Sequence, residues 1–154
     1  MQYHSAGELL EPILSEILNP PEGLQLPLMP SLSNFIGGLR PHEVTILCAG
    51  TGAGKTALLA SIAAQLIKQN VPTFVAPVET GDVDFGVRVL SALARKDLTV
   101  GVKRDPEKFG EEYEESIRQL NESPLFITNY DNRVEIEELR GVMHFASDRD
   151  GVRV

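Results

Sequence analysis

A glycine-rich segment that ends in lysine and threonine is the part of the chain best suited to chemistry. Residues 49–56 read Ala-Gly-Thr-Gly-Ala-Gly-Lys-Thr, between an apolar run and a helical pattern. Glycines lack the Cβ that would block a tight loop whose backbone N–H groups point inward, and a following helix adds its positive N-terminal end. We expect the Lys55 ammonium to reach β- and γ-phosphate oxygens and the Thr56 hydroxyl to ligate Mg²⁺. The segment therefore predicts a nucleoside triphosphate site.

The spacing matches the phosphate-binding loop called Walker A, with Ala49 where the first glycine usually stands. Only the relaxed pattern, with Gly or Ala at that position, is satisfied. We expect ATP and Mg²⁺ as the cofactors. The predicted phosphate-binding residues are Gly50, Thr51, Gly52, Ala53, Gly54, Lys55 and Thr56, with Thr56 as the metal ligand.

Hydrolysis of a phosphoanhydride also needs a carboxylate that positions or activates water near the γ-phosphate. Glu79 directly follows an expected strand at residues 73–78, at the carboxyl edge of a parallel sheet, where ligands bind in such folds. We therefore expect Glu79 to lie beside the glycine-rich loop, and we expect Glu79 and Lys55 to be the catalytic residues. A second acid, which would hold Mg²⁺ through water, has no convincing candidate. Asp131 comes too late after its strand, and residues 152–154 begin a strand without reaching an acid.

Alternating strand and helix patterns position these groups. Strands are expected at residues 44–48, 73–78 and 125–128, and helices near 55–69, from 82, from 105–106, and from Asn132 and Glu135 to about 147. This alternation predicts an α/β fold, with a parallel sheet flanked by helices. The glutamates between positions 107 and 122 are expected to form a solvated face rather than a metal cluster.

The predicted helices each have an inner face of apolar residues. These faces are Leu58, Leu59, Ile62, Ala63, Leu66 and Ile67 in the first helix, Val87, Leu90, Leu93 and Ala94 in the second, and Phe109, Tyr113, Ile117 and Leu120 in the third.

The N-terminal region predicts an amphipathic helix at residues 5–18, with Ser5 and Glu8 placed as a capping box. Pro12 is unfavourable in a helix interior, so the helix alternatively begins at Glu11. A Pro-rich linker follows, which divides the chain into residues 1–23 and a domain at 24–154. Packing of this helix on its own domain or on a neighbouring subunit stays open on the residues alone.

Composition narrows the class of protein. The chain has 154 residues, a formal net charge of −8 and 42% hydrophobic residues, which is ordinary for a globular domain. The acidic charge disfavours nucleic-acid binding by these residues. The absence of a leader or long apolar stretch predicts a cytoplasmic location and no membrane contact. Cys48 is expected to be buried, and His4, His42 and His144 lack metal-ligand spacing.

Residues 30–44, which lead into the loop, resemble the RecA-like ATPase domain of DnaB-type and Twinkle-type replicative helicases, and the likeness runs from about Ser5 to Val154. The resemblance implies a RecA-like P-loop NTPase that couples ATP hydrolysis to translocation on single-stranded DNA. It also implies a hexameric ring in which the N-terminal helix packs on the adjacent subunit. Glu79, followed by Thr80-Gly81 and by Arg88 on a helix, matches the family's catalytic glutamate.

The family pattern continues with a Walker B aspartate, DNA-binding loops and an arginine finger, which residues 1–154 do not include. We therefore expect the front part of a helicase domain, incomplete at its C-terminus and by itself slow or inactive, with DNA contacted by other parts. One alternative is a truncated, non-catalytic nucleotide-binding or adaptor module that docks on a helicase ring. Another is a KaiC-like or RadA-like ATPase, which shares the Gly37-Gly38-Leu39 lead-in. DNA polarity, nucleotide preference and loader or primase partners stay open.

Overall fold

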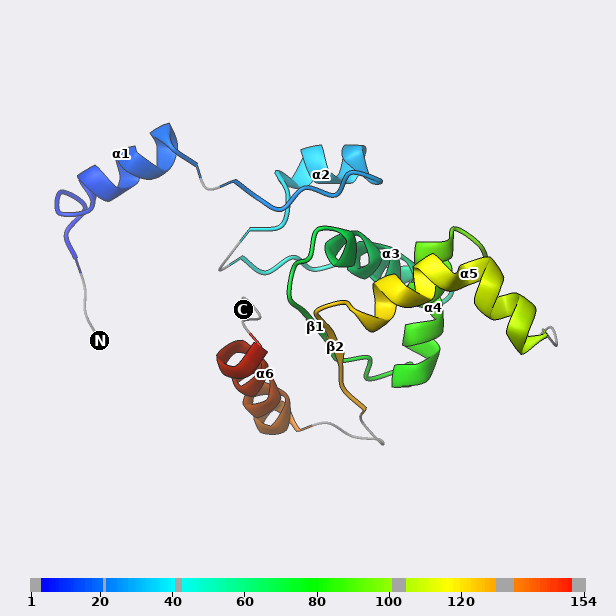
Figure 1. The fold of residues 1–154 in the computed structure, drawn as a ribbon. Helices are drawn as coiled ribbons and strands as arrows, with labels where there is room; N and C mark the ends of the chain where they lie inside the picture. Colours follow the sequence, from blue (N-terminus) through cyan, green and yellow to red (C-terminus); the bar gives the residue numbers. More distant parts are fainter. Residues whose placement is uncertain (1–3, 21, 41–42, 101–104, 130–134, 151–154) are drawn as a thin grey trace. The chain divides into compact units, whose positions relative to one another are not determined.

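The computed structural model describes residues 4–20, 22–40, 43–100, 105–129 and 135–150 (Figure 1). The chain forms two compact units, Met1–Thr45 and Ile46–Val154. The two units divide between Thr45 and Ile46, whereas the sequence predicts a linker that ends at residue 23. The domain boundary at residue 23 stays a prediction.

The first unit begins with helix α1, Leu10–Leu18. The expected capping box is present, because Ser5 N donates to Glu8 Oε2 at 2.9 Å and Glu8 N donates to Ser5 Oγ at 3.3 Å. The regular helix nevertheless begins only at Leu10, which places Pro12 in its first turn, where a missing N–H costs little. No residue of α1 is buried. Its apolar side chains are all exposed, as is Leu9 at its N-cap; they are Leu10, Ile13, Leu14, Ile17 and Leu18.

A second helix, α2 at Pro30–Ile36, was not expected from the sequence. Two backbone hydrogen bonds join Leu24 and Leu39 as an isolated antiparallel bridge that brackets α2. Beside the bridge the backbones of Gly23 and Gly38 pack so closely that a Cβ on Gly23 would lie 2.5 Å from Gly37 O. Inside the bracket Leu26 is fully buried, and Ser33 Oγ accepts from Leu26 N at 3.0 Å.

The second unit contains helices α3 (Lys55–Lys68), α4 (Asp82–Ala94), α5 (Pro106–Asn121) and α6 (Ile136–Asp150) with strands β1 (Thr73–Val75) and β2 (Leu125–Ile127). The strands pair in parallel, with Thr73 opposite Leu125 and Val75 opposite Ile127. A mixed helix and strand unit with a small parallel sheet is compatible with the RecA-like fold expected from the sequence.

The core of this unit lies where α3 packs against α4. Its buried members are Ala60, Ala63, Ala64, Ile67, Phe85, Val89 and Leu93, and the partly buried Val75, Leu120, Leu125 and Ile127 pack against them. Alanines favour the helix and leave room for the large Phe85 ring, which is 2% exposed. The sheet and α5 thus share one core with the helix that follows the glycine-rich loop.

Several predicted inner faces are wrong in detail. Leu59 is 49% exposed, whereas Ala60 and Ala64 are buried in its place. Phe85, which the predicted face omitted, is buried, and Ile117 is 36% exposed. The contact between α3 and α4 selects small residues on one helix and a large one on the other, which apolar periodicity alone does not reveal.

The prediction of a strand at residues 44–48 is also wrong. This segment has no strand structure, and Val44 and Ile46 are 89% and 78% exposed. A strand needs a neighbour that accepts and donates backbone hydrogen bonds, and none of the described residues pairs with this segment. Cys48, expected to be buried within that strand, is consequently exposed.

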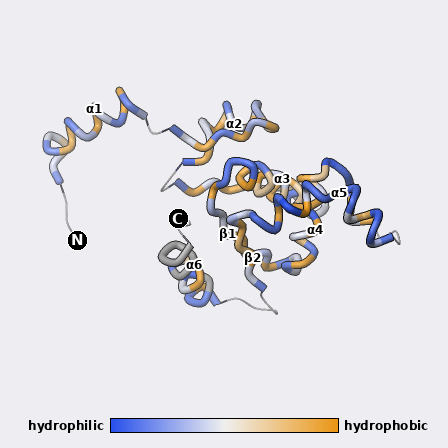
Figure 2. The backbone as a smooth tube through the Cα atoms, viewed as in Figure 1, coloured by the Kyte–Doolittle hydropathy of each residue, from blue (hydrophilic) through white to orange (hydrophobic). Residues whose placement is uncertain are grey.

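Helix α5 begins as predicted, because the Asp105 side chain accepts from Glu107 N at 3.1 Å. Its glutamates are exposed, which confirms the solvated face, and Figure 2 shows hydrophilic residues along much of the helix. Arg118 bridges Glu115 at 2.7 Å and Glu122 at 3.0 Å. No group of three or more potential metal ligands occurs among the described residues.

The last helix, α6, starts at Ile136, close to the predicted position, and continues to Asp150 rather than ending near 147. The predicted cap Asn132, the weak candidate Asp131 and the expected strand at 152–154 lie outside the described residues. Among the helices that the structure describes, none has the length and apolarity to span a membrane.

Candidate functional site

The glycine-rich loop leads directly into α3, as predicted. Gly54 forms the N-cap of α3 with φ +94°, and Gly52 has φ +79°. Residues with a Cβ rarely adopt these backbone conformations, so glycine is required at both positions. A Cβ on Gly50, Gly52 or Gly54 would meet nothing within 4 Å. The requirement for glycine at positions 52 and 54 is therefore conformational and does not come from crowding by neighbouring protein atoms.

The surroundings of the loop suit an anion. Residues 49–54 are exposed, while Lys55 and Thr56 in the first turn of α3 are half-buried. The first N–H groups of a helix lack partners within the helix, and they carry the positive end of its dipole. The first turn of α3 contains no acidic residue that would neutralise this end.

Lys55 folds back over the loop. Its Nζ donates to Ala49 O at 2.9 Å and to Gly50 O at 3.1 Å. An ammonium group has three donors, and hydrogen bonds to charged oxygens are stronger than those to carbonyls. A phosphate that entered the loop would therefore compete well for this group.

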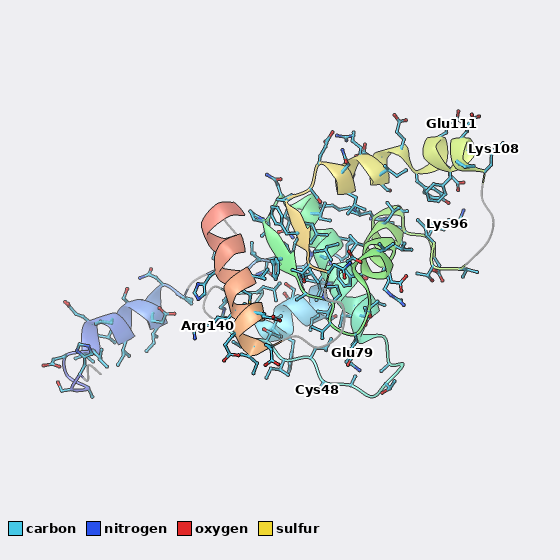
Figure 3. The ribbon with its side chains drawn as sticks, turned by 90° about the horizontal axis from the view of Figure 1, so that it is seen from below. Cys48, Glu79, Lys96, Lys108, Glu111 and Arg140 are labelled. Atoms are coloured by element: carbon cyan, nitrogen blue, oxygen red, sulfur yellow. The ribbon has the colours of Figure 1, made fainter. Side chains whose placement is uncertain are left out.

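Glu79 lies in the connection between β1 and α4, residues 76–81, and its side chain is exposed (Figure 3). The expectation that it directly follows a strand is wrong, because β1 ends at Val75, four residues earlier. The connection contains a tight turn in which Val78 N donates to Ala76 O at 3.0 Å. It ends at Gly81, the N-cap of α4.

Strand β2 and helix α4 each have, within them or just beyond them, a buried polar atom without a hydrogen-bond partner among the described residues. One is Thr128 Oγ1, just beyond β2, and the other is Arg88 Nε, in α4. The sequence pattern singled out Arg88 but not Thr128. The only signal for Thr128 is its place at the end of the apolar run 125–127.

The remaining candidates do not converge on a site. His4 lies 3.9 Å from Glu8 in an exposed pair, His144 is exposed, and His42 lies outside the described residues. In Figure 3, Cys48 lies in the segment that leads into the loop. The described geometry thus assembles the loop and the start of α3, with Glu79 on a separate connection.

Residues 27–154 match the model of a protein family described as the DnaB-like helicase C terminal domain. The match includes the loop, Lys55, Glu79 and Thr128. It confirms the resemblance found in residues 30–44.

Proposed function

The chain belongs to the DnaB-like helicase C-terminal domain family, and we propose that its loop at residues 49–56 binds the phosphates of Mg·ATP. The observation that carries this proposal is the loop itself, with two glycines in left-handed conformations at the N-terminus of α3 and Lys55 folded across it. Backbone N–H groups of Gly50, Thr51, Gly52, Ala53 and Gly54 would hold the phosphates.

Two side chains complete the binding site in this proposal. Lys55 exchanges one or both of its carbonyl contacts, to Ala49 and Gly50, for β- and γ-phosphate oxygens. The Thr56 hydroxyl then becomes a ligand of Mg²⁺, which prefers oxygen donors and retains several waters. Besides the Lys55 contacts, the Ala53 N–H, which donates to Gly50 O at 3.3 Å, would have to exchange this contact for a phosphate oxygen.

We further propose that Glu79 is the catalytic base. Its carboxylate takes a proton from the water whose oxygen attacks the γ-phosphorus, and ADP leaves as the bond to the β-phosphate oxygen breaks. Its exposure leaves the carboxylate accessible to water and nucleotide. The six-residue connection at 76–81 would bring it to the phosphate when ATP binds.

The helicase class suggests a ring. The exposed leucines and isoleucines of α1 support self-association, in which α1 packs on a second copy of the chain and six copies form a hexamer. ATP hydrolysis would then drive translocation on single-stranded DNA, contacted by parts other than this acidic chain.

Glu79→Gln tests the catalytic role, with Glu114→Gln as the control because Glu114 is an exposed glutamate of α5. We expect Glu79→Gln to retain binding of Mg·ATP and to lose at least tenfold of the hydrolysis rate, if necessary measured in single turnovers at high protein concentration. Equal hydrolysis by both variants and the unchanged protein would contradict the role of Glu79.

The second candidate is a non-catalytic nucleotide-binding or adaptor module. The exposed segment 44–48 and the position of Glu79 beyond its strand favour it. Light scattering with Mg·ATP separates the two functions. A self-assembled ring supports the helicase, and a monomer that joins a helicase ring supports the adaptor. The family match favours both over a KaiC-like or RadA-like ATPase.

A further inference from the structure

Thr128 directly follows β2, at the carboxyl end of the two-stranded sheet. Its backbone N donates to Val75 O at 3.0 Å, so it continues the β1·β2 ladder beyond Ile127. In the parallel register the residue opposite Thr128 is Ala76, where the connection that carries Glu79 begins. The carboxyl ends of parallel strands are where α/β folds bind ligands.

The Thr128 hydroxyl forms no hydrogen bond with any of the described residues, and its Oγ1 is buried. Buried hydroxyls are nearly always hydrogen bonded, because leaving one unsatisfied destabilises the folded state. A valine at position 128 would have almost the same shape and would not bury an unsatisfied hydroxyl. We therefore infer that the Thr128 hydroxyl forms a hydrogen bond in another state of the protein.

The connection at 76–81 is the segment suited to supply that partner. It starts opposite Thr128 and ends at α4, where Arg88 Nε is likewise buried without a partner in the part of the chain that the structure describes. Unused hydrogen-bonding capacity thus exists opposite the start of this segment, at Thr128, and within the helix that follows it, at Arg88.

We propose that Thr128 is a positioning residue of the nucleotide site. When a nucleoside triphosphate binds, the 76–81 connection shifts, and one of its polar groups forms a hydrogen bond with Thr128 Oγ1 that holds Glu79 toward the terminal phosphate. A diphosphate lacks that phosphate and does not draw the connection in. This inference rests on the proposed function of the loop at 49–56.

Thr128→Val and Thr128→Ser test the inference, with Thr73→Val as the matched control. Thr73 is at the other end of the same sheet, and its Oγ1 donates to Val71 O at 2.9 Å. The nucleotide-free proteins are compared by thermal unfolding, and each is titrated with fluorescent ADP and with a non-hydrolysable fluorescent ATP analogue, both with Mg²⁺.

We expect Thr128→Val to raise the Tm by about 3 °C or more, because it removes an unsatisfied hydroxyl, and Thr73→Val to lower it. Thr128→Val should bind the ATP analogue about 3- to 10-fold more weakly with unchanged ADP affinity, while Thr128→Ser keeps the preference for triphosphate.

A lowered Tm in Thr128→Val, an unchanged affinity for the ATP analogue, or an equal loss for both nucleotides would overturn the role of Thr128 and leave the loop proposal standing. Failure of the unchanged protein to bind either nucleotide would instead overturn the proposed function and this inference together.

Discussion

Truncating Phe85 should strongly destabilise the second unit, because Phe85 is the most buried of the aromatic side chains whose burial the structure describes there. The ring is 2% exposed and belongs to the core shared by α3 and α4. Phe→Ala changes at such sites cost about 3–5 kcal/mol, from lost burial plus the cavity left behind. Because small domains lose roughly 1–3 kcal/mol per molar urea, Phe85→Ala should lower the urea midpoint by roughly 2 M.

Phe35→Ala is the matched control, because the same side chain on α2 is 90% exposed. That change should alter the stability by no more than about 0.5 kcal/mol. Phe85→Leu, which keeps most of the volume, should cost less than about 1.5 kcal/mol and provides a measurement if Phe85→Ala does not fold. Unfolding is followed by helical circular dichroism. Similar midpoints for Phe85→Ala and Phe35→Ala would refute the described packing of α4 on α3.

Three further changes probe the loop, the first unit and the charged face. Gly54→Ala should cost about 1–2 kcal/mol and weaken nucleotide binding because Gly54 has φ +94°, whereas Gly50→Ala, without a positive φ, should cost less; urea unfolding and a nucleotide titration compare them. Ser33→Ala should cost about 1–3 kcal/mol by leaving Leu26 N without its acceptor, and hydrogen exchange of the Leu26 amide should accelerate; an unchanged rate would contradict the bracket around α2. Hydrogen bonds from Arg118, and then from Gln119, hold the pKa of the Glu115 carboxyl below 4.5, so its stabilisation is present above pH 4.5 and is lost as the pH falls through the lowered value. The stability difference from Glu115→Gln, measured by urea unfolding from pH 7 to 3, should therefore close at the acid end, and a difference that widened there would contradict the assignment.

The elements best predicted from sequence are those with local signals. Asp105-Pro106 marks the start of α5 through a side-chain cap and a fixed φ, and the glycine-rich loop fixes the start of α3. These features depend on residues within a few positions of one another. The family resemblance has the same origin, since it rests on residues 30–44 and the adjoining loop.

The features that the sequence did not predict depend on distant partners. Residues 44–48 have strand-like composition, yet strand structure requires a neighbour, and the described residues supply none. The burial of Phe85 instead of a face through Val87 and Leu90 reflects the alanines of α3 opposite it. The unused hydroxyl of Thr128 is visible only once the surrounding atoms are placed.

Equilibrium titration with Mg·ATP analogue is the most direct test of the nucleotide site. The unchanged protein is compared with Lys55→Ala, at the loop, and with Lys68→Ala, an exposed lysine at the other end of the same helix. We expect saturable binding by the unchanged protein and by Lys68→Ala, and at least tenfold weaker binding by Lys55→Ala, because the ammonium that reaches the phosphates is lost. Equal affinity of all three proteins, or no saturable binding by the unchanged chain, would contradict the assignment of residues 49–56 as the nucleotide site.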